Sequence, residues 1–280
     1  MALKRVRYYF GRFNLLAPFH DNKEEFILSG LRSPTFLTRH GQNWQFLRVE
    51  PLEAPSAGYV TGYLAKYRPL TDEEVAVPAT QDLAEQTIEN RVSAKSRFFL
   101  HIASGLIAYH PVGSLITRDQ FRRRFSEVFE TSKGGFFVSA EIQSIQEEET
   151  LQEAIKALSV VRSVRIYLHP SNPRLRDVWR RTDERLRELH AADYQEHFHS
   201  DSSGDGLRIV HDADINSKVA MAQDGYGRVT VTGLKDGEEL SVSTDDNPTN
   251  ALGPADDAAP EQVLEILEKL FLRILARFEQ

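Results

Sequence analysis

The segment Thr117 to Phe129, TRDQFRRRFSEVF, constrains the fold more than any other stretch of the chain, because it has the pattern of a capped amphipathic helix. Thr117 can act as the N-cap, and Gln120 is placed to complete a capping box. Four apolar residues recur at the helical period and predict a face that packs on a core: Phe121, Phe125, Val128 and Phe129.

Four arginines are predicted to occupy the remaining surface of this helix close to its N-terminus: Arg118, Arg122, Arg123 and Arg124. Cations at that end oppose the helix dipole, which favours anions there. We therefore expect an anionic partner, such as the phosphates of a nucleic acid. A solvated basic face is the alternative interpretation, since the mismatch costs only about 0.3 to 1 kcal/mol per charge.

Composition describes an ordinary folded protein of 280 residues, with 41% hydrophobic and 27% charged residues. The chain has no cysteine, which excludes disulfides, thiolate nucleophiles and cysteine-ligated zinc. The N-terminal MALKRVRYYF lacks the apolar run of a signal peptide, and no stretch of about 18 apolar residues could span a bilayer. We expect a cytoplasmic protein with no membrane insertion.

The formal net charge of −7 is unevenly distributed. Residues 236–261 contain eight acids and no Lys or Arg, so the other 254 residues carry a net charge of +1. The basic residues are 25 Arg and 9 Lys, and the planar guanidinium suits phosphate and carboxylate partners. Biased genome composition would produce the same excess of arginine. One hypothesis is that the acidic segment occupies the basic surface when nucleic acid is absent.

The first subdomain is predicted to comprise residues 1–135, an antiparallel, β-rich unit that ends in the arginine helix. A strand is expected at 5–16, and hairpins are expected from 35–38 with 44–49 and from 97–102 with 106–110. Residues 58–67 are another extended candidate, whereas 72–96 carry no clear pattern.

Residues 136–280 are predicted to form a second, β-α-β-α-β-β subdomain with a C-terminal helix, which makes the fold class α+β. Strands are expected at 138–142, 164–168, 207–210, 218–222, 228–232 and 240–243. Helices are expected at 148–161, from 172 to about 189, and at 261–278, with an irregular acidic loop at 244–260. The last helix has a wide apolar arc, which packs either on the core or on a second copy in a homodimer.

Two further groups of basic residues are predicted to contact nucleic acid. Arg174 and Arg176 open the second arginine-rich helix, whose later charges pair with one another at i to i+4 spacing. Lys95 and Arg97 lie beside His101, Tyr109 and His110 on the hairpin before the first arginine helix. Cations there would engage phosphates and aromatic rings would stack on unpaired bases, unless the hairpin is an ordinary polar surface.

Catalytic signatures are weak, and we assign no catalytic residue, metal ligand or cofactor. Arg185 and His190 have the R-x4-H spacing of HEPN ribonucleases, but Leu186 replaces their usual polar residue. Residues 190–205 are expected to form a polar loop, and their histidines and acids lack a metal-site spacing. Asp212, Asp214 and Lys218 lack the internal spacing of D…D/E-x-K nucleases.

Three motifs between residues 95 and 278 carry a family resemblance. They are FFLHIASGLIAYHP before a helix, FFVSAEIQSI and VRIYLHPSNP around a helix, and AMAQDGYGRVTVTG before STDDNPTN and a terminal helix. With these, the chain resembles the RexA phage-exclusion proteins of temperate phages and a related family carried by bacteria and mobile elements.

The resemblance implies an intracellular DNA-binding dimer that senses phage infection, signals to a separate effector protein and does no chemistry itself. Together with the arginines, it predicts sequence-nonspecific nucleic-acid binding, with DNA favoured over RNA, in a sensor or regulator of phage exclusion. A nuclease effector and a protein-interaction subunit without affinity for nucleic acid are the alternatives.

Overall fold

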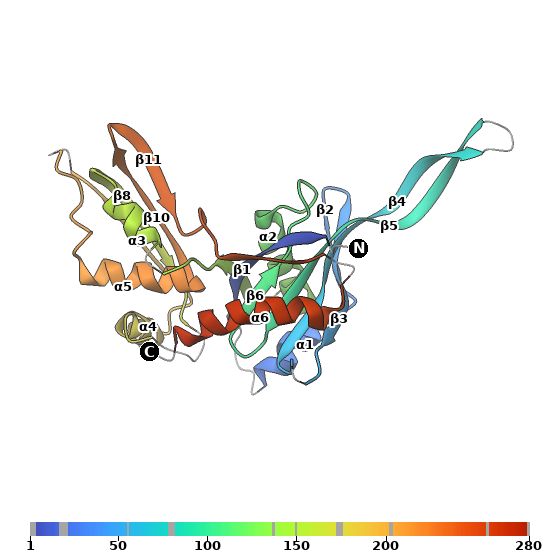
Figure 1. The fold of residues 1–280 in the computed structure, drawn as a ribbon, viewed down its shortest axis with the longest axis horizontal. Helices are drawn as coiled ribbons and strands as arrows, with labels where there is room; N and C mark the ends of the chain where they lie inside the picture. The colour runs from blue at the N-terminus through green and yellow to red at the C-terminus, as the bar shows by residue number, and fades with distance from the viewer. Residues whose placement is uncertain are drawn as a thin grey trace.

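The protein is a two-lobed α+β molecule, which confirms the predicted fold class (Figure 1). The computed structural model describes residues 4–16, 22–54, 56–77, 82–135, 138–148, 150–171, 176–201, 204–255 and 258–278. Each lobe is built on one antiparallel sheet.

The first lobe contains an eight-stranded sheet with the order β12-β1-β6-β5-β4-β3-β2, and β7 pairs with the second half of β1. Its strands are β1 (Arg5–Leu16), β2 (Phe36–Arg39), β3 (Gln42–Pro51), β4 (Tyr59–Val77), β5 (Asp82–His101), β6 (Leu106–Tyr109), β7 (Ser139–Ser144) and β12 (Asn250–Pro254). The two predicted hairpins are present as β2–β3 and β5–β6.

Helices cover both faces of this sheet. On one face, α2 (Arg118–Ser132) and α1 (Lys23–Leu31) bury an aromatic cluster that includes Phe13, Phe98 and Phe125. On the other face, α6 (Pro260–Ala276) buries its apolar arc against the sheet (Figure 1). That arc is therefore core within its own chain, and a homodimer remains a prediction.

The second lobe contains a four-stranded sheet with the order β11-β10-β8-β9. Its strands are β8 (Val160–Leu168), β9 (Tyr194–His199), β10 (Gly227–Lys235) and β11 (Glu238–Ser243). One face packs on α3 (Thr150–Lys156), α4 (Arg180–Glu188) and α5 (Ala213–Met221) around Trp179 and Val219. Strands β7 and β12 pair within the first sheet and α6 packs on it, although all three follow residue 135 in the chain. The division of the chain at residue 135 remains a prediction.

Two predicted strands of the second lobe are wrong. Residues 218–222 belong to α5 and to the π-turn η1 (Ala222–Tyr226), and 207–210 form no strand. Asp212 explains the helix, because its Oδ1 accepts a hydrogen bond from the Ile215 amide at 2.9 Å and caps the first turn. Ile215 and Val219 then face the core four residues apart.

Two predicted loops instead contain strands. Residues 194–199, expected within a polar loop, form β9, and 250–254, expected within the irregular acidic loop, form β12. Both strands complete the edge of a sheet, so their structure depends on partners that are distant in sequence.

Within the segment 72–96, which has no clear sequence pattern, residues 72–77 and 82–96 belong to the two strands of a long hairpin arm. Strands β4 and β5 pair from Tyr59↔His101 out to Val77↔Asp82. Figure 1 shows that the outer part of this hairpin extends away from the body of the first lobe. Pro69 and Asn90 interrupt the ladder where the arm leaves the body, and Asn90 has a φ of 51°.

Candidate nucleic-acid interface

Helix α2 forms as its sequence predicts. The Thr117 Oγ1 accepts a hydrogen bond from the Gln120 amide at 3.2 Å, and the Gln120 Oε1 accepts one from the Thr117 amide at 3.1 Å. This reciprocal capping box satisfies two amides that would otherwise lack a helical partner. Phe121, Phe125 and Phe129 are fully buried, and the Phe121 ring stacks on Tyr109 at 4.2 Å between centroids.

Two of the four arginines of α2 are buried, so the prediction that all four lie on the surface is wrong. Arg122 is 9% exposed and donates hydrogen bonds to Asp245 at 2.5 Å and to Asp119 at 2.7 Å. Arg124 is 6% exposed, pairs with Glu127 and lies over the Trp44 ring. Acids three residues away, at 119 and 127, were the sequence signal for these pairings.

Asp245 neutralises the arginine that the sequence analysis had assigned to phosphate. Burial alone would raise the pKa of the Asp245 carboxyl, but hydrogen bonding to Arg122 and the charges of Arg122 and Arg228 outweigh it and lower the pKa. Arg228 Nε lies 2.9 Å from Asp245 Oδ2. The acidic segment is thus part of the fold, with one of its carboxylates bound to α2.

Arg123 is exposed, but it borders a cavity of about 580 Å³ that is rich in carboxylates. Five acids line this cavity: Asp119, Glu127, Glu130, Glu141 and Asp245. Phosphate would meet like charge here, so Arg123 is poorly placed to bind a nucleic-acid backbone.

The remaining arginine, Arg118, lies in a basic depression at the N-terminus of α2. The depression has a volume of about 550 Å³ and is lined by residues of β1, β12, α2 and the segment after β6: Arg7, Tyr9, His110, Pro111, Gly113, Thr117, Arg118 and Leu252. The Arg118 guanidinium lies 5.1 Å from the centroid of the Tyr9 ring. Arg7 and Tyr9 were not predicted from the sequence, although alternation along β1 places them on one face together with the exposed Arg5.

Among the described residues, the lining of the basic depression includes cationic side chains and no carboxylate. None of the described residues that line it is acidic, and within the described ranges no ion pair joins Arg5, Arg7 or Arg118 to a carboxylate. The nearest acid along the helix, Asp119, bonds to Arg122. The amides at the start of α2 add the positive end of the helix dipole, so this surface favours an anion.

Lys95 and Arg97 do not join the basic depression, because they lie on the opposite face of the sheet. Arg97 is 3% exposed, packs over Phe99 on the α6 side and donates to the Ala258 carbonyl at 2.8 Å. Lys95 is exposed, with its Nζ 4.4 Å from the centroid of the Tyr63 ring.

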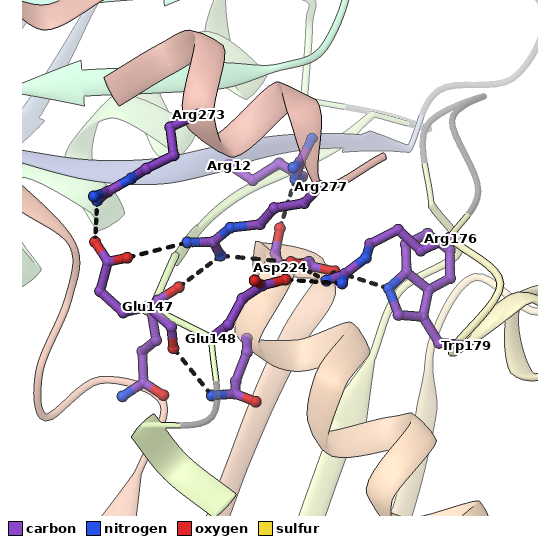
Figure 2. A network of polar contacts seen from close by, with 10 residues as sticks. Arg12, Glu147, Glu148, Arg176, Trp179, Asp224, Arg273 and Arg277 are labelled. Atoms are coloured by element: carbon purple, nitrogen blue, oxygen red, sulfur yellow. Dashed lines mark hydrogen bonds and ion pairs between the residues drawn. The ribbon is translucent and has the colours of Figure 1, made fainter. Parts of the chain in front are cut away.

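Of the second pair of predicted arginines, the structure describes only Arg176, since Arg174 lies outside the described residues. Arg176 donates to Asp224 at 3.0 Å and to Glu148 at 2.8 Å within a polar network at the junction of the lobes (Figure 2).

Asp224 is the centre of this network and is 1% exposed. Its carboxylate also accepts a hydrogen bond from Trp179 Nε1 at 2.9 Å, and its carbonyl accepts one from Arg12 Nε of β1 at 2.7 Å. Arg277, just after α6, also points toward the Asp224 carboxylate (Figure 2). Its Nη1 lies 3.7 Å from Asp224 Oδ1. The network therefore connects the first sheet and α6 to the second lobe.

A family model matches residues 8–274, described as a domain of unknown function, DUF4747. The chain belongs to the DUF4747 family. No curated protein matches the sequence. The matched region spans both lobes and includes Arg118 and Asp224, whereas Arg5 and Arg7 precede it. The family description names no activity, so functional conclusions depend on the geometry of the chain.

In this DUF4747 member, the weaker catalytic patterns do not assemble into a metal site among the described residues. Lys218 Nζ lies 2.5 Å from Asp214 and 2.7 Å from Glu196, so these acids neutralise a lysine. Arg185 and His190 are both exposed near the end of α4. No described helix combines the length and apolar character needed to cross a membrane.

Proposed function

We propose that this DUF4747 protein binds nucleic acid without sequence preference, DNA in preference to RNA, through the basic depression at the N-terminus of α2. Its role would be that of a sensor or regulator in phage exclusion, as the resemblance to RexA-like proteins implies. Among the arginines predicted from the sequence, Arg118 is the proposed central contact. Arg5, Arg7 and His110 are proposed as further contacts beside it.

The observation that carries the proposal is the grouping of Arg7 and Arg118 around Tyr9 without a lining carboxylate among the described residues. Arginines that already have acidic partners, such as Arg122, would lose those ion pairs on binding phosphate. Arg7 and Arg118 would lose none. Contacts of this kind are made to the backbone, so they supply affinity and carry no sequence information.

The test is binding of labelled duplex DNA, single-stranded DNA and RNA across a salt series, with magnesium present and products resolved on a denaturing gel. For Arg7→Ala/Arg118→Ala we expect weaker duplex binding and a smaller salt slope, by about 0.9 for each phosphate that the protein no longer neutralises. Both side chains are on the surface, so the variant should remain folded by circular dichroism.

The matched control is Lys156→Ala/Arg162→Ala, which removes the same charge from exposed positions on the second lobe. Equal losses of affinity in the two variants would mean that total charge, not the depression, governs binding. Absence of binding by the wild type would refute the proposal and favour a protein partner. Magnesium-dependent cleavage that EDTA abolishes would favour a nuclease.

A further inference from the structure

One face of the four-stranded sheet is uncovered. The helices of the second lobe pack on the face that carries Val164, Ile166 and Val229. The alternate residues of β8, β9 and β10 point the other way and are exposed or half-buried: Ser163, Arg165, Tyr167, Gln195, His197, His199, Arg228, Thr230 and Thr232. We call these nine residues the open face.

Strand pairing arranges the open face in rows across the sheet. Arg165 pairs with His197 on one side and with Thr230 on the other, and Tyr167 pairs with Gln195 and Arg228. Directly opposite residues on antiparallel strands bring their side chains within about 4.5–5.5 Å at Cβ. A hollow of about 490 Å³ lies over these two rows.

The open face combines aromatic, cationic and hydrogen-bonding groups. The Tyr167 ring lies next to Arg228 in the pairing register, and the His197 and His199 rings are 4.1 Å apart between centroids. None of its nine residues is acidic, but Glu141 and Asp193 lie near Tyr167, and burial followed by their charges raises the pKa of its hydroxyl to about 12. Glu196 also borders the hollow, but its carboxylate bonds to Lys218, so its charge is compensated.

Arg165 is the cation of this face that is available to a ligand. Arg228 shares its charge with Asp245, whereas no ion pair joins Arg165 to a carboxylate within the described ranges. Arg165 Nε donates instead to His197 Nε2 at 3.3 Å, which requires that ring nitrogen to be unprotonated. Desolvation, followed by the charges of His199 and Arg165, lowers the pKa of His197, in agreement with a neutral ring.

This set of groups matches unpaired nucleotides better than a duplex. Aromatic side chains on an open sheet stack on exposed bases, each stack contributing about 1–3 kcal/mol, and such contacts tolerate any base. Bases inside a duplex are stacked on one another and cannot lie flat on Tyr167. The flanking Arg165 and the row of hydroxyl groups can contact the backbone that connects the bases.

We propose that the open face binds a single-stranded segment of nucleic acid, with Tyr167 stacking on a base and Arg165 contacting phosphate. The site is separate from the basic depression and extends the proposed function by a second class of ligand. It rests on the proposed function only in assuming that the protein meets nucleic acid.

The test is fluorescence anisotropy of the full-length protein with labelled dT15, rU15 and a 15-base-pair duplex. For Arg165→Ala/Tyr167→Ala we expect an affinity for the single strands at least 10-fold lower, with duplex affinity unchanged. Arg7→Ala/Arg118→Ala should show the reverse pattern. Tyr167→Phe, which keeps the ring, should stay within about twofold of the wild type.

The matched control is Lys156→Ala, which removes the same charge from an exposed position on α3, one of the helices that cover the other face of the sheet. The proposal is overturned if this control loses as much single-strand affinity as Arg165→Ala does. It is also overturned if Tyr167→Phe and Tyr167→Ala weaken single-strand binding equally. Failure of the wild type to bind either single strand would overturn it as well. Failure to bind only the duplex would instead overturn the proposed function.

A second measurement uses the wild-type protein alone, so it does not depend on how a variant folds. Ultraviolet cross-linking to an oligonucleotide that carries 5-bromouracil should label the peptide containing Tyr167, as identified by mass spectrometry. Cross-links confined to other peptides would contradict the proposed site. Tighter binding of rU15 than of dT15 would assign the open face to RNA, whereas equal binding would assign it to unpaired nucleotides of either kind.

Discussion

Arg118 and Arg122 are one helical turn apart, yet their side chains have opposite environments. Arg118 is half-exposed over Tyr9, whereas Arg122 is buried between Asp119, Asp245 and the hydroxyl of Ser144. A buried guanidinium is costly unless carboxylates and acceptors satisfy it. Arg122 is therefore a structural residue, which leaves Arg118 as the member of this pair able to bind an external phosphate.

The ion pair between Arg122 and Asp245 should dominate the acid sensitivity of the fold. Asp245→Asn leaves the buried Arg122 with a weakened set of acceptors, so we expect a loss of about 3 kcal/mol in the free energy of unfolding at pH 7. The pKa of Asp245 is lowered in the folded state. Its contribution is therefore present above its unfolded pKa of about 4 and is lost as pH falls further.

Urea unfolding of the wild type and Asp245→Asn at pH 7 and at pH 3 measures this linkage. The two proteins should differ clearly at pH 7, and the difference should be smaller at pH 3. Asp246→Asn is the matched control, since Asp246 is exposed and should change stability little. A difference between wild type and Asp245→Asn that does not depend on pH would show that the charge of Asp245 is not the cause.

The sequence predicts side chains whose partners are local and misses those whose partners are distant. Thr117 and Gln120 bond across three residues, and the capping box was predicted correctly. Asp119 signals a local partner for Arg122, but Asp245, the acid that completes its burial, is 123 residues away and could not be found from the sequence around α2. The basic depression was missed in part for the same reason, because Arg7 and Arg118 meet only when β1 lies beside the start of α2.

At the scale of the element, the capping box links the stability of α2 to the shape of the basic depression. Thr117 both caps the helix and lines the depression. Thr117→Ala removes the side-chain acceptor for the Gln120 amide and should lower the free energy of unfolding by about 1 kcal/mol. Thr117→Ser keeps the acceptor and should remain close to the wild type. Chemical denaturation of both variants measures this, and equal stabilities would show that the cap contributes little.

Elements with a clear local sequence pattern were predicted, whereas strands whose conformation depends on their partners in the sheet were not. The aromatic and branched residues of 5–16 and the helical period of α6 both identified their elements. The strand predicted at 218–222 was wrong because Val219 and Met221 face the core from a helix that Asp212 caps. Strand β12 has only five residues, and its pairing with β1 decides its conformation.

At the scale of the molecule, the two lobes are connected by ion pairs and hydrogen bonds around Asp224 as well as by the polypeptide chain. Asp224 receives hydrogen bonds from Arg176 and Trp179, while Arg12 and Arg277 reach it from the first sheet and from the end of α6 (Figure 2). Gly225 follows with a φ of 86°, and an added Cβ would lie 2.7 Å from Arg12 Cβ. The glycine thus allows β1 to approach the start of the second lobe closely.

The long hairpin arm carries negative charge that would oppose the proposed binding of nucleic acid. Residues 71–88 contain five acids and no Lys or Arg, so replacing them with an Asn-Gly turn changes the formal net charge from −7 to −2. Two strands alone are marginally stable in water, so the body of the lobe should keep its stability without the outer arm. Less negative charge should raise affinity for DNA at low salt by at least about twofold, with the gain disappearing at high salt, where screening is strong.

Salt-dependent binding of the shortened protein tests this, with thermal unfolding to confirm that the body remains folded. The control keeps the arm but removes three of its charges, as Asp72→Asn/Glu74→Gln/Glu85→Gln. If charge is the cause, both proteins gain affinity at low salt, in proportion to the charge removed. A gain seen only on deletion would show that the arm obstructs the DNA sterically, and lower affinity on deletion would mean that the arm itself contacts nucleic acid.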